Sequence, residues 1–196
     1  MSLTDSISQL KKFCYAIHEL TDSEWNEFAK IWHAYESKRK TILTAQGETE
    51  QSLYFITKGV QRAYFVTEDA KEATLVFTYP YSFSGVADSF LTQTPSRYFF
   101  ETLTHSHYIK TSHQQLQWLL DQHPNFQRLM FKATSLALRG ALERQTELQT
   151  YTAEKKFSTL LKRSPQVLRL IPHKYLASYL GIDAATFSKL LSTVRV

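Results

Sequence analysis

The spacing of apolar residues changes twice along this 196-residue chain, and these changes constrain its fold more than any other feature. Near the start, Ile7, Leu10 and Cys14 recur at steps of three and four residues, which is the period of one helix face. Between residues 41 and 112 the pattern becomes that of strands, and from residue 114 the helical period returns. The sequence therefore predicts an α+β protein with a β-rich centre between helical ends.

The β-rich centre is expected where aromatic and β-branched residues concentrate between turn residues. These segments are residues 53–57, 60–66, 73–78 and 98–104. Lys58 and Gly59 form the expected turn between the first two strands. Gly59 and Gly85 fall in turns, where a positive φ or a close backbone approach favours glycine. Residues 35–112 are therefore expected to form a small antiparallel β-barrel or β-roll.

A long helix is expected from Asn125 to Thr150, because Pro124 is tolerated in a first helical turn and the helical period persists beyond it. Small and flexible residues follow one another along one stripe of this helix at alternating four- and three-residue steps. They are Met130, Ala133, Ala137 and Gly140. Such a stripe allows two backbones to come close, so it predicts a dimer interface. The alternative is that the stripe packs on the β-rich part of the same chain.

Residues 172–191 have the pattern of two short helices joined by a glycine turn. Leu176 lies on the apolar side of the first helix, and Gly181 stands where a helix ends in a left-handed residue. Asp183 can cap the second helix, in which Phe187 faces inward. This spacing predicts a helix-turn-helix whose second helix enters the DNA major groove. A helical hairpin that only packs is the alternative.

Positive charge is concentrated near the C-terminal end. The chain has 23 lysines and arginines and 18 acidic residues, of which ten and four, respectively, lie between Arg139 and Val196. That part carries a net charge of +6, whereas the rest, with 13 basic and 14 acidic residues, carries −1. A basic end on a neutral body is expected of a protein that binds phosphates there, and a solvated basic surface is the alternative.

The composition is that of an ordinary globular protein, with 43% hydrophobic and 21% charged residues. No segment approaches the length of apolar residues that a membrane span needs, and residues 1–5 show no secretion signal. A cytoplasmic protein without a membrane partner is therefore expected. The single Cys14 excludes an internal disulfide and is expected to be buried.

Residues 172–191 and three other segments resemble the cyclic-AMP receptor protein/fumarate-nitrate regulator (CRP/FNR) family of bacterial transcription regulators, especially the versions common in Bacteroidetes. The other segments are residues 53–66, Gly85 with residues 95–97, and residues 153–157. The resemblance covers residues 10–192. It implies a cyclic-nucleotide-binding-like antiparallel β-roll with flanking helices, a long dimerisation helix and a C-terminal DNA-binding domain. It also implies a homodimer on a two-fold-symmetric operator.

The resemblance implies an effector site, but this chain departs from the family's pattern there. Members that bind a cyclic nucleotide use a Gly-Glu pair for the ribose and an arginine some ten residues later for the phosphate. This chain has Gly85, but Val86 and Ser96 stand at the glutamate and arginine positions. Arg97 is one residue further along, on the opposite face of a strand. Losing two charged hydrogen bonds, worth about 1.5–3 kcal/mol each, predicts that cyclic AMP does not bind in the standard way.

A shifted loop would bring Arg97 inward, so the expected effector-binding residues are Gly85, Ser96 and Arg97, together with Arg139 of the long helix. The effector itself is unknown, and no cofactor is expected.

The expected DNA contacts come from both helices of the helix-turn-helix. Lys189 is a long donor suited to guanine, Thr186 could contact a thymine methyl or a phosphate, and Ser188 a backbone oxygen. His173 and Lys174, at the start of the first helix, are expected to contact phosphates.

Two features predict limited direct reading of the DNA sequence. The resemblance implies arginine and glutamate where this chain has Ala184 and Ala185, so we expect Ala185 to face the DNA and specificity to rely partly on DNA shape. The chain also ends at Val196, where the family continues into a β-hairpin, so a helix-turn-helix lacking a full wing is expected. The alternative is an effector-binding protein that has lost specific DNA binding and acts through a protein partner.

Other chemistries are not expected. Iron–sulfur members of the family need several cysteines, and this chain has one. His105 and His107 would point the same way on a strand, but without a third nearby ligand they are expected to be surface residues and no metal is expected. The sequence has no glycine-rich phosphate loop, nucleophile elbow or His-Glu-x-x-His motif, so we expect no catalytic residues and no enzyme.

The sequence thus predicts three parts. Residues 1–124 form a β-roll sensor domain with N-terminal helices, residues 125–150 the dimerisation helix, and residues 151–196 the DNA-binding domain. The expected function is transcription regulation by a homodimer that binds double-stranded DNA. A small-molecule effector and RNA polymerase are the further partners expected.

Overall fold

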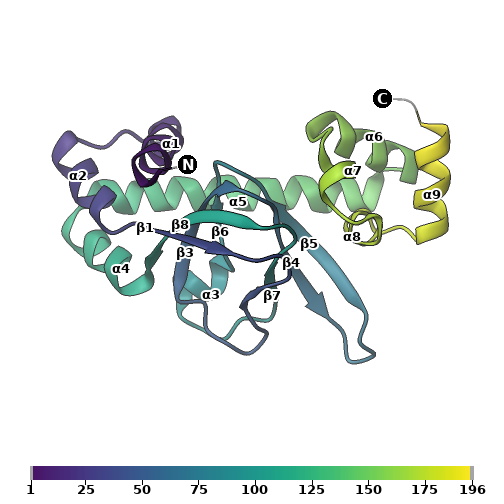
Figure 1. Cartoon of the computed structure of the whole chain (residues 1–196), viewed down its shortest axis with the longest axis horizontal. Helices are drawn as coiled ribbons and strands as arrows, with labels where there is room; N and C mark the ends of the chain where they lie inside the picture. Colours follow the sequence, from purple (N-terminus) through teal and green to yellow (C-terminus); the bar gives the residue numbers. More distant parts are fainter. Residues whose placement is uncertain (1, 195–196) are drawn as a thin grey trace.

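The computed structural model describes residues 2–194 (Figure 1). A β-sandwich occupies the middle of the molecule, the long helix α5 (Pro124–Thr150) runs along it, and the other helices gather mainly at its two ends. Outside the described residues lie Met1, Arg195 and Val196. The chain end at which a full wing is expected to be missing therefore lies outside them as well.

The sandwich consists of two antiparallel four-stranded sheets with the orders β1-β8-β3-β6 and β2-β7-β4-β5. Its strands are β1 (His33–Ser37), β2 (Ile42–Thr44), β3 (Ser52–Lys58), β4 (Gln61–Val66), β5 (Glu72–Thr78), β6 (Phe83–Ser84), β7 (Phe99–Thr102) and β8 (Ser106–Ser112). The four strands predicted from the sequence correspond to β3, β4, β5 and β7. The α+β class and the antiparallel β-roll are therefore confirmed.

The turn at Gly59 joins strands of opposite sheets, because β3 and β4 are neighbours in sequence but belong to different sheets. Gly59 has a φ of +96°, and an added Cβ would lie 2.4 Å from Ser106 Oγ and 2.8 Å from the His105 carbonyl oxygen. Only glycine fits this turn without moving the start of β8.

Two apolar cores lie on the two faces of the sheet that contains β3 and β8. Between the two sheets, Ile56, Phe100 and Tyr108 form the interior of the sandwich. On the outer face, Phe55 and Ile109 pack against the N-terminal helices and the first half of α5. Alternate residues of β3 and β8 therefore serve different cores, as the two-residue period of a strand requires.

Four helices surround this outer core, and three of them begin with a side-chain cap. The four helices are α1 (Leu3–Ile17), α2 (Asp22–Lys30), α3 (Ala87–Thr92) and α4 (His113–Gln122). Capping boxes begin α1 at Ser2 and α2 at Thr21. Cys14 is buried in α1 at 0% exposure, as expected.

The C-terminal helices are α6 (Ala153–Arg163), α7 (Val167–Leu170), α8 (His173–Leu180) and α9 (Ala184–Thr193). Their core is shared with the sandwich, because Val60, Phe77 and Leu103 of the sandwich belong to the same apolar cluster as Phe157 and Leu176. The described residues 151–194 therefore pack directly on the β-roll. No helix of residues 2–194 has the length and apolarity needed to cross a membrane.

Candidate DNA-binding surface and effector cavity

Helices α8 and α9 meet at a turn that the sequence specifies closely. Gly181 has a φ of 63° and a ψ of 40°, in the left-handed region. Its N–H donates to the Ser178 carbonyl at 3.0 Å, and the Ile182 N–H donates to the Ala177 carbonyl at 3.1 Å. Asp183 caps α9 by accepting from the Thr186 N–H at 2.8 Å. The turn thus satisfies the last carbonyls of α8 and the first N–H groups of α9.

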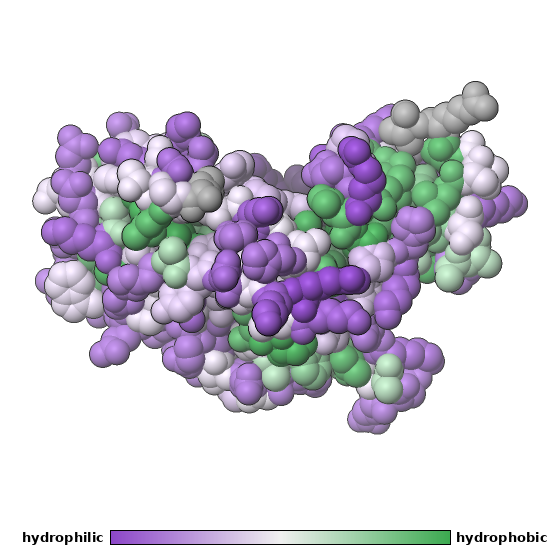
Figure 2. All heavy atoms as spheres, in the orientation of Figure 1, coloured by the Kyte–Doolittle hydropathy of each residue, from purple (hydrophilic) through white to green (hydrophobic). Residues whose placement is uncertain are grey.

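The inward faces of these two helices pack on α6. Leu176 and Leu180 of α8 are 0% exposed, Phe187 of α9 is 1% exposed, and Phe157 of α6 lies edge-on to Phe187 with ring centroids 5.4 Å apart. Aromatic and leucine side chains thus fix the angle between α8 and α9. Apolar side chains also gather over these C-terminal helices on the face seen in Figure 2.

The residues expected to contact DNA lie on the outer side of α8 and α9, with one exception. His173, Lys174, Ala185, Ser188 and Lys189 are exposed. Thr186 is half-buried, and its hydroxyl donates to Asp183 Oδ2 at 2.7 Å. These hydrogen bonds from Thr186 lower the pKa of Asp183. The Thr186 hydroxyl therefore belongs to the helix cap, and only its methyl group remains for an outside contact.

Helix α8 is attached to the sandwich at strand β5, the last strand of its sheet. Ser178 Oγ accepts from the Thr74 N–H at 2.9 Å and donates to the Glu72 carbonyl oxygen at 3.2 Å. An edge strand leaves such backbone groups unpaired unless something covers them. The serine therefore supplies α8 with two direct bonds to the sheet edge.

The buried side chain of Arg62 completes this contact. Its Nε donates to Glu101 Oε1 at 2.6 Å, and its Nη2 donates to Glu72 Oε2 at 2.5 Å. Its guanidinium carbon lies 3.9 Å from the ring centroid of Tyr64 and 3.7 Å from that of Tyr175 in α8. Because Arg62 is 1% exposed, the two carboxylates compensate a charge that water cannot reach.

A second set of contacts joins α8 to α5 and α6. Arg144 of α5 donates to the carbonyl oxygen of Tyr179 and, at 3.1 Å, to Glu147 Oε2. Glu147, 5% exposed, also pairs with Arg163 of α6. Burial raises the pKa of the Tyr179 hydroxyl, whose ring centroid lies 4.0 Å from the Arg144 guanidinium carbon. The orientation of α8 therefore depends on the largely buried Arg144–Glu147 pair of α5, to which Arg163 of α6 adds a more exposed contact.

A cavity of about 260 Å³ lies between the sandwich and α5. Val76 and Leu91 line it from the sandwich side, and Met130, Ala133 and Ala137 line it from α5. None of the described residues that line it carries a charge. The space therefore suits a small apolar or neutral molecule better than an anion.

Gly85 lies at the edge of this cavity, where the family resemblance expects a phosphate-binding segment. A buried carboxyl group occupies the space beside it. Glu50 is 2% exposed and accepts from Thr44 Oγ1 at 2.6 Å, from the Ser52 N–H at 3.0 Å and from the Val86 N–H at 3.4 Å. Burial raises the pKa of Glu50 even though these hydrogen bonds oppose the shift. The Val86 N–H is thus already used by a side chain of the protein.

The other residues expected around the effector do not line the cavity. Ser96 is buried, and its hydroxyl accepts from the Tyr98 N–H at 2.9 Å and donates to the Tyr98 carbonyl at 2.7 Å. Arg97 is exposed. Arg139 is exposed and lies in a groove beside Ile17 of α1. Of the four residues predicted for the effector site, the structure brings only Gly85 to the cavity.

The four residues predicted to form a dimer interface do not share one environment in the structure. Met130, Ala133 and Ala137 face the chain's own sandwich across the cavity, as the alternative reading of the stripe allowed. Gly140 is exposed, and an added Cβ would meet nothing within 4 Å. A different stripe of α5 exposes large apolar side chains. Its members are Phe131 (74% exposed), Leu138 (60%) and Leu142 (59%), spaced seven and four residues apart.

Sequence reasoning missed Glu50 and Arg62. Arg62 stands inside an apolar strand. This position in the sequence indicates a buried charge, which acidic residues must compensate. The acids themselves, Glu72 and Glu101, lie on neighbouring strands and cannot be paired with it from the sequence. Glu50 precedes β3 and has no sequence feature that distinguishes it from an exposed glutamate.

Comparison with known proteins agrees with this geometry. Residues 36–123 match the family model of the cyclic nucleotide-binding domain. No curated protein matches the sequence. Solved structures of the same fold include FixK2 from Bradyrhizobium japonicum, at a TM-score of 0.72 and 18% identity over 83% of each chain. The catabolite activator protein of Thermus thermophilus matches at a TM-score of 0.56 and 19% identity, over 90% of this chain and 84% of that one.

A third solved structure is a putative CRP/FNR-family transcriptional regulator from Eubacterium rectale, at a TM-score of 0.70 and 12% identity over 88% of this chain and 82% of that one. Residues 36–123 are therefore similar to a cyclic nucleotide-binding domain. Its fold is that of the CRP/FNR transcription regulators, and the predicted resemblance is confirmed at this level. The narrower likeness to Bacteroidetes versions stays a prediction.

Proposed function

We propose that this protein is a homodimeric transcription regulator that binds double-stranded DNA with α9 and responds to a small molecule bound beside the β-roll. The observation that carries the proposal is the α8–α9 pair, with a glycine turn, a capped second helix and an exposed outer side that includes Lys189. The fold shared with regulators such as the Thermus catabolite activator protein supports it. A protein that binds DNA in this way would work in the cytoplasm.

In this proposal Lys189 contacts a guanine in the major groove and Ser188 a backbone oxygen. His173 and Lys174 contact phosphates at the start of α8. Thr186 offers only its methyl group, because its hydroxyl is bonded to Asp183. With alanine at residue 185, few groups read base edges directly, so DNA shape supplies part of the specificity. RNA polymerase remains a further partner in the proposal.

We propose that the dimer forms along the exposed stripe of Phe131, Leu138 and Leu142 on α5. Large apolar side chains exposed at steps of seven and four residues are typical of a helix that packs along a second helix in a coiled-coil-like pair. The small-residue stripe expected from the sequence is less suited, because Ala133 and Ala137 face the chain's own sandwich.

The effector we propose is small and largely apolar rather than a cyclic nucleotide. Among residues 2–194 no charged side chain lines the cavity, and Glu50 would place a carboxyl group beside any phosphate at Gly85. The Val86 N–H that such a phosphate would use is already bonded to Glu50, so a phosphate would have to break this hydrogen bond. We therefore expect cyclic AMP to leave the thermal unfolding temperature unchanged.

The DNA-binding part is tested by selecting bound duplexes from a random pool at two salt concentrations. The wild type should enrich a palindromic motif, with an affinity that falls steeply as salt increases. The Lys189→Ala/Ser188→Ala variant should bind that motif roughly five- to 150-fold more weakly, since the base contact of Lys189 is worth about 1–3 kcal/mol. Lys12→Ala, an exposed lysine on α1, is the matched control and should bind as the wild type.

Failure to enrich any motif, with variant and wild type alike, would overturn the proposal. It would favour an effector-binding protein that acts through a protein partner.

A further inference from the structure

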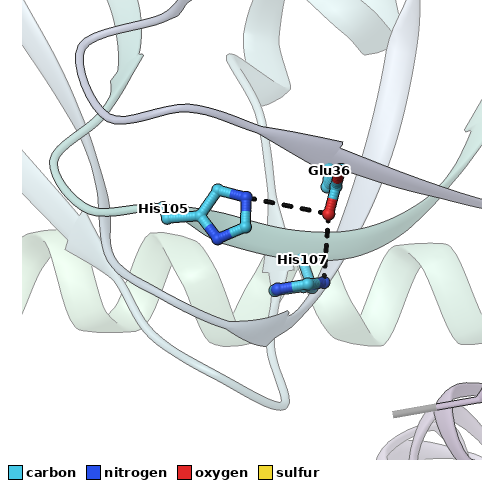
Figure 3. Close-up of side chains that lie close together, drawn as sticks. All are labelled: Glu36, His105 and His107. Carbon is cyan, nitrogen blue, oxygen red and sulfur yellow. Dashed lines mark ion pairs between the residues drawn. The ribbon is translucent and has the colours of Figure 1, made fainter.

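Two histidines and a glutamate converge on the outer face of the β1–β8 pair (Figure 3). Glu36 of β1 and His107 of β8 stand directly opposite each other in the antiparallel register. His105 precedes β8, and the intervening Ser106 is 0% exposed and points into the sandwich. Because side chains alternate along a strand, His105 and His107 share the face that Glu36 occupies.

The three side chains are close enough to hold one ion. His105 Nε2 lies 3.7 Å and His107 Nδ1 lies 3.8 Å from Glu36 Oε2. All the ligand atoms of the cluster lie within 4.8 Å of one another. Ligands of a tetrahedral zinc ion, with bonds of about 2.0–2.2 Å, stand roughly 3.3–3.6 Å apart. Small side-chain rotations therefore suffice to bring the cluster to coordination distance.

We propose that Glu36, His105 and His107 form a binding site for a divalent transition metal ion of the zinc type. Two imidazoles and one carboxylate suit zinc, whereas magnesium and calcium prefer oxygen ligands alone. Three protein ligands leave a coordination position for water or another exchangeable group. The sequence offered only the histidine pair, and the third ligand comes from a strand that is far away along the chain.

A bound metal ion explains why these three side chains converge better than their contacts with one another do. The distances to Glu36 exceed those of a hydrogen bond, so the three described side chains converge without bonding to one another. As exposed ion pairs they would contribute little to stability. His105 also lines a cleft of about 600 Å³ that separates the sandwich from the segment Leu168–His173, and this cleft gives an ion access to the site.

The test is a titration of the untagged full-length protein with Co²⁺ followed by visible absorption, and displacement of Co²⁺ by Zn²⁺. One equivalent should bind with a spectrum that lacks thiolate-to-metal bands, because Cys14 is buried and burial raises its thiol pKa to about 12. Glu36→Gln, His105→Ala and His107→Ala should each weaken binding at least about tenfold. His33→Ala removes an exposed histidine of the same strand as Glu36 and should bind as the wild type.

The site residues are exposed or half-buried, so circular dichroism and thermal unfolding without metal should match the wild type in all four variants. Histidine ring resonances provide a second readout, and Zn²⁺ should shift those of His105 and His107 while leaving His33 unchanged. The proposal is overturned if the wild type binds no Co²⁺ or Zn²⁺. It is equally overturned if the His105→Ala/His107→Ala double variant binds the metal as tightly as the wild type does.

Discussion

The guanidinium carbon of Arg62 in the β-roll lies 3.7 Å from the ring centroid of Tyr175 in α8. On its other side lies the ring of Tyr64, at 3.9 Å. The cation is thus enclosed between an aromatic ring of the sandwich and an aromatic ring of α8. A change in the roll that moves Arg62 would act directly on α8, and through α8 on α9, the helix proposed to bind DNA.

Replacing Tyr175 by alanine should loosen α8 from the sandwich. The substitution removes a cation–π contact worth about 0.5–2 kcal/mol in a desolvated place. Hydrogen exchange of the α8 amides should accelerate, by roughly two- to thirtyfold if the full contact energy opposes opening. Tyr175→Phe keeps the ring and should exchange as the wild type does. Equal exchange rates in the alanine variant and the wild type would show that the stacking does not hold α8.

Charges on the exposed stripe of α5 should dissociate the dimer. In Leu138→Asp/Leu142→Asp, association would bury carboxylates against apolar side chains, which costs several kcal/mol. The dimer dissociation constant measured by sedimentation equilibrium should rise at least about a hundredfold.

Two further variants identify the contact face of α5. Leu136→Asp changes a residue that is 43% exposed and lies on another side of the helix, and it should dimerise as the wild type does. Gly140→Asp lies on the small-residue stripe predicted from the sequence. If Gly140→Asp dissociates the dimer and Leu138→Asp/Leu142→Asp does not, the small-residue stripe forms the interface.

Alanine at the two glycines of the C-terminal half should have opposite effects on stability. At Gly181 a Cβ must adopt a φ of 63°, which costs about 1–2 kcal/mol, so Gly181→Ala should lower the free energy of unfolding. Gly140 lies inside α5 in open space, and Gly140→Ala should raise the free energy of unfolding by about 0.4–1 kcal/mol. Urea unfolding monitored by circular dichroism measures both values. Destabilisation by both variants would contradict the helical geometry of Gly140.

Glu50 should make stability depend on pH in an unusual direction for a carboxylic acid. Burial raises its pKa above the ordinary value of 4.5, so the folded state holds this proton at pH values where the unfolded state has released it. The contribution of Glu50 is therefore most favourable below the ordinary pKa and is lost as pH rises through the raised value. Glu50→Gln carries no such proton.

Urea unfolding of wild type and Glu50→Gln from pH 4 to 7 checks this prediction. The wild type should lose stability relative to the variant as pH rises. Glu68→Gln, at an exposed position, is the control for removing one negative charge. A difference between wild type and Glu50→Gln that stays constant with pH, or grows in favour of the wild type, would contradict the raised pKa.

Local patterns determined much of this protein. The apolar runs of β3 and β4, the proline that begins α5, and the α8–Gly181–α9 turn depend on residues close together in sequence. Each of these features follows from backbone sterics and from which face of an element is apolar. For the same reason the strands β3, β4, β5 and β7, the long helix α5 and the inward residues of α8 and α9 could be predicted.

Which side chains meet at the α8 contact, at the cavity and in the histidine cluster was decided by the tertiary structure alone. Arg62 reaches Glu101 across strands, Glu50 fills the space beside Gly85, and the stripe of Ala133 and Ala137 faces the sandwich. Glu36 meets His107 only because β1 pairs with β8, a pairing of residues about seventy positions apart. Such contacts depend on the packing of whole sheets and helices, which no short stretch of sequence encodes, because the energy that fixes them is shared among all the buried residues of the cores.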